Sequence, residues 1–133
     1  MIHLTRRSTL AGLCLAPFAV RAQSADQIAF HFYGAQNCPP CIAFKRAGLP
    51  IVQAAGDASG FSVIENMIAR TQDIGDVGIY GPADPLLRQA GGQLNRIYPP
   101  LFIVTRGDDI LSAREGDWRS ALADAEAASK AKT

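Results

Sequence analysis

The feature that most constrains the fold of this chain is a pair of cysteines, Cys38 and Cys41, at the junction of a predicted strand and a predicted helix. Ile28–Tyr33 precedes the pair and is a nearly continuous apolar run, as expected of a strand that is covered on both faces. Residues three apart on the first turn of a helix share a face, and their Cα atoms fall within the roughly 4.4 to 6.8 Å that a disulfide needs. The two sulfurs can therefore form a disulfide.

A disulfide between residues this close removes little conformational entropy from the unfolded chain compared with a bridge across a long loop. It would stabilise the fold weakly, but it could open and close as part of a reaction. A Cys-x-x-Cys motif at a strand-to-helix junction is typical of a redox-active site. The alternative is an inert structural disulfide.

The residues between the cysteines are Pro39 and Pro40, which occupy the first helical turn, where a missing N–H costs least. Cys38, at the helix start, meets unpaired amides and the positive end of the helix dipole, both of which stabilise a thiolate. We therefore predict that Cys38 is the nucleophile and Cys41 the resolving thiol. Because the two prolines remove two amide donors, we expect only a moderate lowering of the Cys38 pKa.

The N-terminal segment Met1–Ala22 has the pattern of an export signal. Arg6 and Arg7 form a basic start, Leu10–Val20 is an apolar core, and the residues ending at Ala22 approximate the small-x-small cleavage pattern. The apolar core is shorter than the about 20 residues that a transmembrane helix needs. A twin-arginine signal and an ordinary Sec signal both fit.

Removal of this signal leaves residues 23–133, enough for one compact domain. The signal contains three arginines and no acidic residue, so the formal net charge falls from +1 to −2, which predicts no nucleic-acid binding. Cys14 leaves with the signal, and Cys38 and Cys41 become the only cysteines. We expect a periplasmic monomer, not inserted in the membrane, in a compartment where disulfides persist.

The middle of the chain has a less regular pattern. Phe61–Ile68 alternates in part between apolar and polar residues and is interpreted as a second central strand. Gly56–Gly60 is a cluster of turn-forming residues, and Gly48 with Pro50 is expected to end or kink the first helix. Thr71–Tyr80 is expected to be mainly loop.

Two further helices are marked by an aspartate at the start. Asp84 followed by Pro85 predicts a short helix that stops at a pair of glycines. Asp117 predicts the cap of the last helix, with Trp118 and Leu122 on its packed face. We expect Trp118 to anchor that helix.

A β-hairpin is predicted between these helices. Leu101–Thr105 and Ile110–Glu115 are its strands, and Arg106–Asp109 is its turn. Pro99 and Pro100 stand directly before the first strand, a position at which a proline can be cis.

With these elements in this order, the chain resembles the thioredoxin family. The likeness covers nearly the whole mature chain: a strand, the Cys38/Cys41 motif, a helix, a strand, a helix, a proline, a hairpin and a helix. It implies an α/β, thioredoxin-like fold with a central mixed β-sheet flanked by helices. It also implies a protein-disulfide oxidoreductase.

The resemblance also assigns a substrate site. In the family, a proline just ahead of the hairpin is cis and faces the redox cysteines. Counting back from the turn at Gly107 matches Pro99 to that proline, although Pro100 is also possible. Tyr98 and Pro99 would then bind substrate, the backbone of Tyr98 pairing with an extended peptide. A packing role is the equal alternative for Tyr98.

The chain departs from thioredoxin at several positions. Thioredoxin has a buried carboxylate where this chain has Phe32, and a tryptophan where this chain has Asn37. Leu49–Tyr80 has no clear counterpart. The base that would deprotonate the second cysteine is therefore absent or comes from elsewhere.

The implied chemistry is thiol–disulfide exchange, which needs no organic cofactor. His31 is the only histidine of the mature chain, so a zinc site lacks ligands and we expect no metal. The expected partners are protein dithiols or disulfides and a membrane redox partner. By family analogy, the Pro39-Pro40 pair favours a reductant over an oxidant.

Two non-enzymatic alternatives remain. The Cys38 and Cys41 thiolates could hold a soft metal such as Cu(I), as in a metallochaperone or adaptor. The domain could also be an inactive interaction module.

Overall fold

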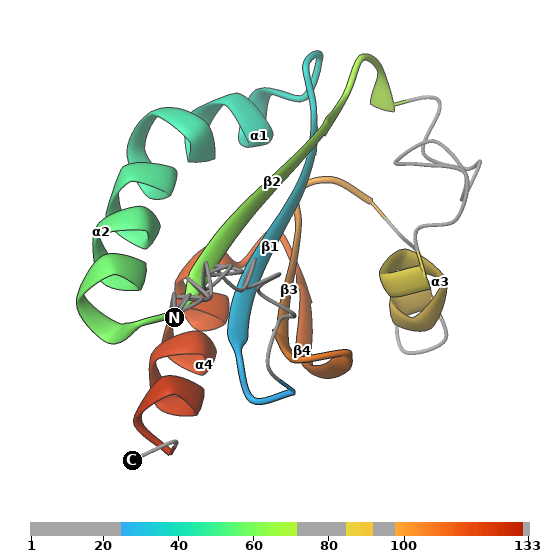
Figure 1. Ribbon diagram of the computed structural model, residues 1–133. Coiled ribbons are helices and arrows are strands. Elements are labelled where there is room, and N and C mark those ends of the chain that lie inside the picture. The colour runs from blue at the N-terminus through green and yellow to red at the C-terminus, as the bar shows by residue number, and fades with distance from the viewer. Residues whose placement is uncertain (1–24, 72–84, 92–97, 132–133) are drawn as a thin grey trace, which may run out of the picture.

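The computed structural model of the protein describes residues 25–71, 85–91 and 98–131 (Figure 1). The sequence predictions that lie outside these residues are the export signal Met1–Ala22, most of the loop Thr71–Tyr80 and the cap Asp84. No helix within the described ranges is both long and apolar enough to cross a membrane.

Four strands form one mixed sheet in the order β2, β1, β3, β4. Their bounds are β1 (Ile28–Ala35), β2 (Ser62–Ile68), β3 (Leu101–Arg106) and β4 (Asp109–Glu115). β1 pairs in parallel with β2 and antiparallel with β3, and β3 and β4 form the predicted antiparallel hairpin.

Helices cover both faces of this sheet (Figure 1). The helical bounds are α1 (Pro39–Ala43), the π-helical segment η1 (Phe44–Gly48), α2 (Leu49–Ser59), α3 (Pro85–Gly91) and α4 (Trp118–Lys130). α1, η1, α2 and α4 pack on one face, and α3 packs on the other. The predicted α/β, thioredoxin-like fold with helices around a mixed sheet is confirmed.

Aromatic rings form the core between the sheet and the first helical layer. Phe30 and Phe32 of β1 point to this face, because side chains two apart on a strand share a face. The ring of Phe44 in η1 has its centroid 4.6 Å from that of Phe32 and 4.8 Å from that of Phe102 in β3. Trp118, at the start of α4, adds a ring 5.7 Å from Phe44. These rings join β1, β3, η1 and α4.

The opposite face of the sheet has a smaller core. Tyr33, Leu101 and Ile103 of the sheet pack there with Leu87 and Ala90 of α3. β1 is therefore covered on both faces, which explains its continuous apolar run.

β1 is longer than predicted. The turn was predicted to begin at Gly34, but Gly34 and Ala35 continue the parallel pairing with Met67 and Ile68 of β2. This ladder carries the strand to within three residues of Cys38.

The first helix does not end at Gly48 or Pro50. The backbone stays helical through η1 and on to Ser59, and the π-helical segment ends two residues before Pro50, whose missing N–H interrupts the regular ladder. The actual end is Gly60, which has φ 82° and donates its N–H to the Gly56 carbonyl at 2.8 Å. The predicted turn cluster is thus the last turn of α2 and its cap.

β2 is an edge strand among the described elements, although a central strand was predicted. Its side chains are mostly only partly buried, which accounts for its partial alternation. Glu65 of β2 pairs with Lys45 of η1 at 2.7 Å. A charged pair of this kind disfavours the addition of another strand to that edge.

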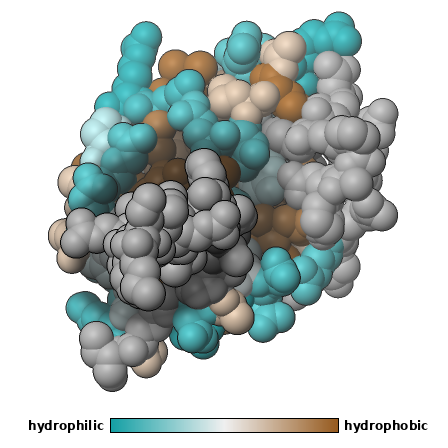
Figure 2. Space-filling model, viewed as in Figure 1, coloured by the Kyte–Doolittle hydropathy of each residue, from teal (hydrophilic) through white to brown (hydrophobic). Residues whose placement is uncertain are grey.

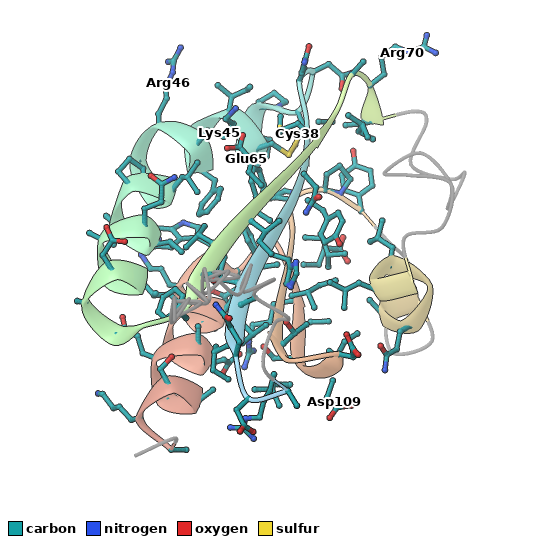
Figure 3. The ribbon with its side chains drawn as sticks, in the orientation of Figure 1. Cys38, Lys45, Arg46, Glu65, Arg70 and Asp109 are labelled. Carbon is teal, nitrogen blue, oxygen red and sulfur yellow. A yellow bond between two sulfur atoms is a disulfide. The ribbon has the colours of Figure 1, made fainter. Side chains whose placement is uncertain are left out.

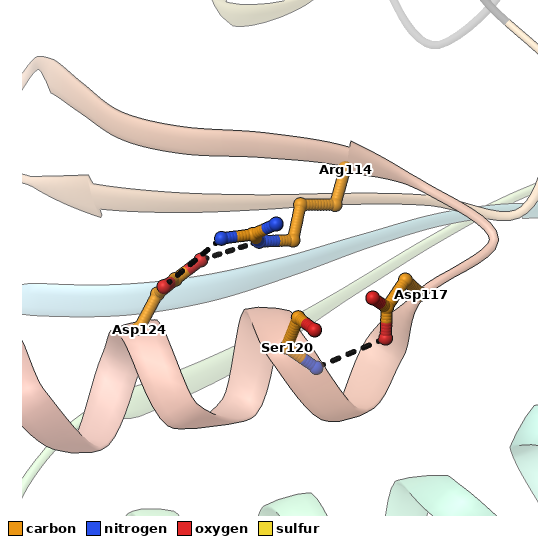
Figure 4. Close-up of polar contacts among 4 residues, drawn as sticks. All are labelled: Arg114, Asp117, Ser120 and Asp124. Carbon is orange, nitrogen blue, oxygen red and sulfur yellow. Dashed lines mark hydrogen bonds and ion pairs between the residues drawn. The ribbon is translucent and has the colours of Figure 1, made fainter.

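Polar contacts fasten α4 to the hairpin (Figure 4). Asp117 caps the helix as predicted, because its Oδ1 accepts a hydrogen bond from the Ser120 N–H at 3.0 Å. Arg114 of β4 donates to Asp124 of α4 with Nε at 2.6 Å from Oδ2 and Nη2 at 3.3 Å from Oδ1. The hydrogen bonds from Ser120 lower the pKa of Asp117, and those from Arg114 lower the pKa of Asp124.

The packing of Gly48 leads to a stability prediction. A Cβ at this residue would meet ring carbons of Phe44 and would lie 3.0 Å from Cε2 of Trp118. Gly48→Ala is therefore expected to lower the free energy of unfolding by about 1 to 3 kcal/mol, measured by urea denaturation. Ala54→Gly, at an exposed site of α2, is the control for helix propensity alone. Alanine is favoured over glycine by about 1 kcal/mol within a helix, so propensity by itself would make Gly48→Ala more stable, not less. A Gly48→Ala protein more stable than wild type would contradict this packing.

The lowered carboxyl pKa values predict a pH dependence. Because the pKa of Asp124 is lower in the folded chain than in the unfolded chain, its stabilisation is complete above the unfolded value of about 3.9 and is lost as the pH falls through the folded value. The stability difference between wild type and Asp124→Asn should therefore shrink between pH 6 and acid pH, measured by urea denaturation. Asp57→Asn, at an exposed site of α2, is the control. A stability difference between wild type and Asp124→Asn that does not change with pH would contradict the lowered pKa of Asp124.

Candidate active site

The structure joins the two predicted cysteines in a disulfide. Cys38 and Cys41 lie where β1 ends and α1 begins, with their Cα atoms 5.2 Å apart, and the pair is found near the Cys38 label in Figure 3. The predicted motif prolines Pro39 and Pro40 form the first two positions of α1. Motif and helix start therefore coincide as predicted.

Cys38 caps the helix with its sulfur. Its Sγ accepts a hydrogen bond from the Cys41 N–H at 3.3 Å, as the oxygen of an aspartate or serine does at an ordinary helix cap. The Cys38 carbonyl accepts the Ile42 N–H at 3.1 Å. Because Pro39 and Pro40 have no N–H, the Cys41 amide is the first donor that this helix end offers to the sulfur.

The two cysteines differ in their access to solvent. Cys38 is 3% exposed and Cys41 is fully buried. The small surface that the pair presents to solvent therefore belongs to Cys38. The roles of nucleophile for Cys38 and resolving thiol for Cys41 stay predictions.

Backbone contacts hold the turn in front of the motif. The Gln36 N–H donates to the Ile68 carbonyl at 2.9 Å, and the Cys38 N–H donates to the Ala35 carbonyl at 3.3 Å. Asn37 Oδ1 accepts the Thr71 N–H at 2.8 Å. The asparagine that stands in place of thioredoxin's tryptophan thus ties the turn to the segment after β2. Sequence reasoning did not assign Asn37 this role.

The cis peptide bond lies between Pro99 and Pro100. Pro100, not Pro99, is therefore the cis proline, which corrects the preferred match. β3 begins directly after it at Leu101, and the Pro100 carbonyl accepts the Gly116 N–H at 2.8 Å. Counting residues back from the hairpin turn could not separate two adjacent prolines.

The two residues predicted to bind substrate, Tyr98 and Pro99, both precede the cis bond. Pro99, directly before the cis proline, has its carbonyl oxygen 3.8 Å from Cys38 Sγ and is buried. Tyr98 lies one residue further away and is 48% exposed. Because the residue before the cis bond is itself a proline, its backbone has a carbonyl but no N–H.

A pocket that the sequence reasoning missed borders the site. It has a volume of about 300 Å³ and lies between the helix of the cysteines and the start of α4. Pro40 and Pro100 contribute to its wall, as does Trp118, which was predicted only to anchor its helix. No sequence signal links residues so far apart in the chain.

Two residues singled out in the sequence have structural roles. Phe32 is completely buried in the aromatic core, so that position supplies no carboxylate to the cysteines. His31 points to the opposite face of the sheet, where its Nε2 lies 3.0 Å from Thr105 Oγ1. In the part of the chain that the structure describes, no three or more His, Cys, Asp or Glu side chains are grouped to hold a metal ion.

Comparisons with known proteins show structural likeness only. No protein-family model and no curated protein matches the sequence. Thioredoxin f2 of Chlamydomonas reinhardtii is 14% identical, with a TM-score of 0.47 and coverage of 76% of this chain and 78% of that chain. The short form of spinach chloroplast thioredoxin f is 12% identical, with a TM-score of 0.47 and coverage of 77% of each chain.

Proposed function

We propose that this protein is a thiol–disulfide oxidoreductase that acts on protein disulfides and works mainly as a reductant. The observation that carries the proposal is the Cys38–Cys41 disulfide at the start of α1, in which Cys38 is 3% exposed and Cys41 is fully buried. A structural bridge across so short a segment would contribute little stability.

The proposed reaction is a two-step exchange. In the reduced protein, the Cys38 thiolate attacks one sulfur of a partner disulfide, and the second partner sulfur leaves as a thiolate with the bonding electron pair. Cys41 loses its proton and attacks Cys38 Sγ, which releases the first partner sulfur. The leaving thiolates take up protons from solvent. Two electrons pass to the partner, and the Cys38–Cys41 disulfide re-forms.

The hydrogen bonds around Cys38 favour a reductant. A strongly stabilised thiolate makes a cysteine pair oxidising, because it stabilises the reduced form. Among the residues that the structure describes, one N–H, that of Cys41, reaches the Cys38 sulfur, while Pro39 and Pro40 supply none and the Pro99 carbonyl faces the sulfur at 3.8 Å. The reduced state therefore has little extra stabilisation.

The surface beside Cys38 suits an extended partner segment. The exposed Tyr98 leads to Pro99, which is buried and has its carbonyl oxygen 3.8 Å from Cys38 Sγ, so the backbone of Tyr98 is the part open to a partner segment. Pairing in the manner of an added strand would be short, because prolines occupy two successive positions.

We place this activity in the periplasm. The support is the export-signal pattern of Met1–Ala22, together with a cysteine pair that suits an oxidising compartment. A reductant there needs electrons from across the membrane, so we propose a membrane redox partner that re-reduces the Cys38–Cys41 disulfide.

The roles of the two cysteines predict distinct variants. Cys38→Ser should abolish reduction of insulin disulfides by dithiothreitol, because no accessible nucleophile remains. Cys41→Ser should instead accumulate a mixed disulfide with insulin, because the resolving thiol is missing. Insulin precipitation and non-reducing gels measure both.

Asp57→Asn, remote from the site in sequence and exposed on α2, should behave as wild type. Wild-type protein that fails to reduce insulin, in a fold verified by circular dichroism, would overturn the proposed activity. A mixed disulfide that forms through Cys41 in Cys38→Ser would overturn the assignment of roles.

The small number of N–H donors to the Cys38 sulfur predicts a low reduction potential for the cysteine pair. Equilibration with a dithiothreitol series should give a value near or below about −270 mV, that of a reductant. Pro40→Ala restores an N–H at the second helical position, from which a cap side chain accepts. A hydrogen bond to a charged group contributes about 1.5 to 3 kcal/mol, so the potential should rise by about 30 to 60 mV.

Pro39→Ala is the matched control, since an N–H at the first helical position is not one that a cap side chain ordinarily binds. The reduction potential of Pro39→Ala is therefore expected to rise by less than that of Pro40→Ala. A wild-type potential near about −120 mV would identify an oxidant and contradict the proposed direction.

A further inference from the structure

The pocket beside the cysteine pair has a defined position relative to the reacting sulfur. Pro40, directly before Cys41, forms part of one wall, and Pro100 forms part of another. Pro100 follows Pro99, whose carbonyl oxygen is 3.8 Å from Cys38 Sγ. Because an extended chain spans about 3.3 to 3.6 Å per residue, a partner bonded to Cys38 can reach the pocket with a residue close to its own cysteine.

The pocket is preformed and its lining is largely apolar. The rings of Phe44, Phe102 and Trp118 line it, and the absence of a side chain at Gly48 lets the rings of Phe44 and Trp118 lie close to its backbone. The hydrogen bond from the Gly116 N–H to the Pro100 carbonyl, at 2.8 Å, fixes its rim. In Figure 2, apolar residues gather among hydrophilic ones at the end of the molecule that carries α1.

The volume of the pocket limits what it can hold. Its roughly 300 Å³ lies at the lower end of the range of small-molecule sites. A single apolar side chain suits such a space better than a large ligand.

A cation lies at the edge of this apolar pocket. Arg119 contributes to the lining, is exposed, and has its guanidinium carbon 4.6 Å from the centroid of the Trp118 ring. The neighbouring Asp117 caps α4 through the Ser120 N–H, and the positive charge of Arg119 contributes to the lowered pKa of Asp117. Because Arg119 is exposed at the edge of the pocket, its charge can also attract a carboxylate brought by a partner.

We propose that this pocket recognises the partner protein: it takes an apolar side chain close to the partner's cysteine, and Arg119 selects an acidic residue beside that side chain. The inference rests on the proposed exchange at Cys38. Trp118 and Arg119 are, on this basis, specificity-determining residues rather than catalytic ones.

Symmetrical peptide disulfides test the proposal on the full chain. Each peptide has one cysteine, with a Leu-Glu, Leu-Lys or Ser-Glu pair placed one to three residues to either side of it. The rate constant for oxidation of the reduced protein is measured by thiol alkylation and mass spectrometry. It is divided by the rate constant with hydroxyethyl disulfide, a neutral molecule too small to engage the pocket.

Wild-type protein should react with the best-placed Leu-Glu peptide about two- to fivefold faster than with its Leu-Lys counterpart, and the difference should shrink at high salt. Leu-Glu should also exceed Ser-Glu by about tenfold. Arg119→Glu should reverse the charge preference and Arg119→Lys should keep it. Arg46→Glu is the matched control, because Arg46 is an exposed cation of η1 that points away from the sheet in Figure 3.

Equal rates for Leu-Glu and Ser-Glu at every position would overturn the apolar subsite. A charge preference that is unchanged in Arg119→Glu, or changed as much in Arg46→Glu, would overturn the role of Arg119. Each of these failures leaves exchange with hydroxyethyl disulfide intact. Failure of the wild-type protein to react with any disulfide would instead overturn the proposed function, and this inference with it.

Discussion

The packing of Phe44 is the contact on which the position of the cysteine pair depends. Its ring lies against Phe32 of β1 and Phe102 of β3, and Trp118 of α4 closes over it. Phe44 follows Cys41 by three residues in a backbone that stays helical. The aromatic core therefore holds the sulfur pair at one end of the sheet, next to the prolines that precede β3.

Much of this arrangement could be predicted from local patterns. The continuous apolar run of β1, the cysteine spacing and the aspartate cap of α4 depend on neighbouring residues, and each was confirmed. The length of the first helix was not foreseen, because a π-helical segment accommodates Pro50 and the turn-forming Gly56 lies within the helix. Local propensity was overridden there by packing on the aromatic core.

The parts of the site that escaped prediction depend on contacts between distant segments. Pro99 and Pro100 are equivalent in a count along the chain, and the cis peptide bond before Pro100 and the hydrogen bond from Gly116 to its carbonyl distinguish them in the structure. The pocket beside them needs Trp118 to meet a helix from the first third of the chain. Nothing in the local sequence around Trp118 distinguishes a wall of a pocket from an ordinary helix anchor.

The unequal burial of the two cysteines also bears on chemical damage. Cys38 is 3% exposed and Cys41 is fully buried, so an oxidant in the surrounding solution would meet Cys38 first. A sulfenic acid formed on Cys38 would lie within one helical turn of the Cys41 thiol, with which it can condense to the disulfide and release water. Because that product is the ordinary oxidised state, the geometry diverts the first oxidation step away from the irreversible sulfinic and sulfonic acids.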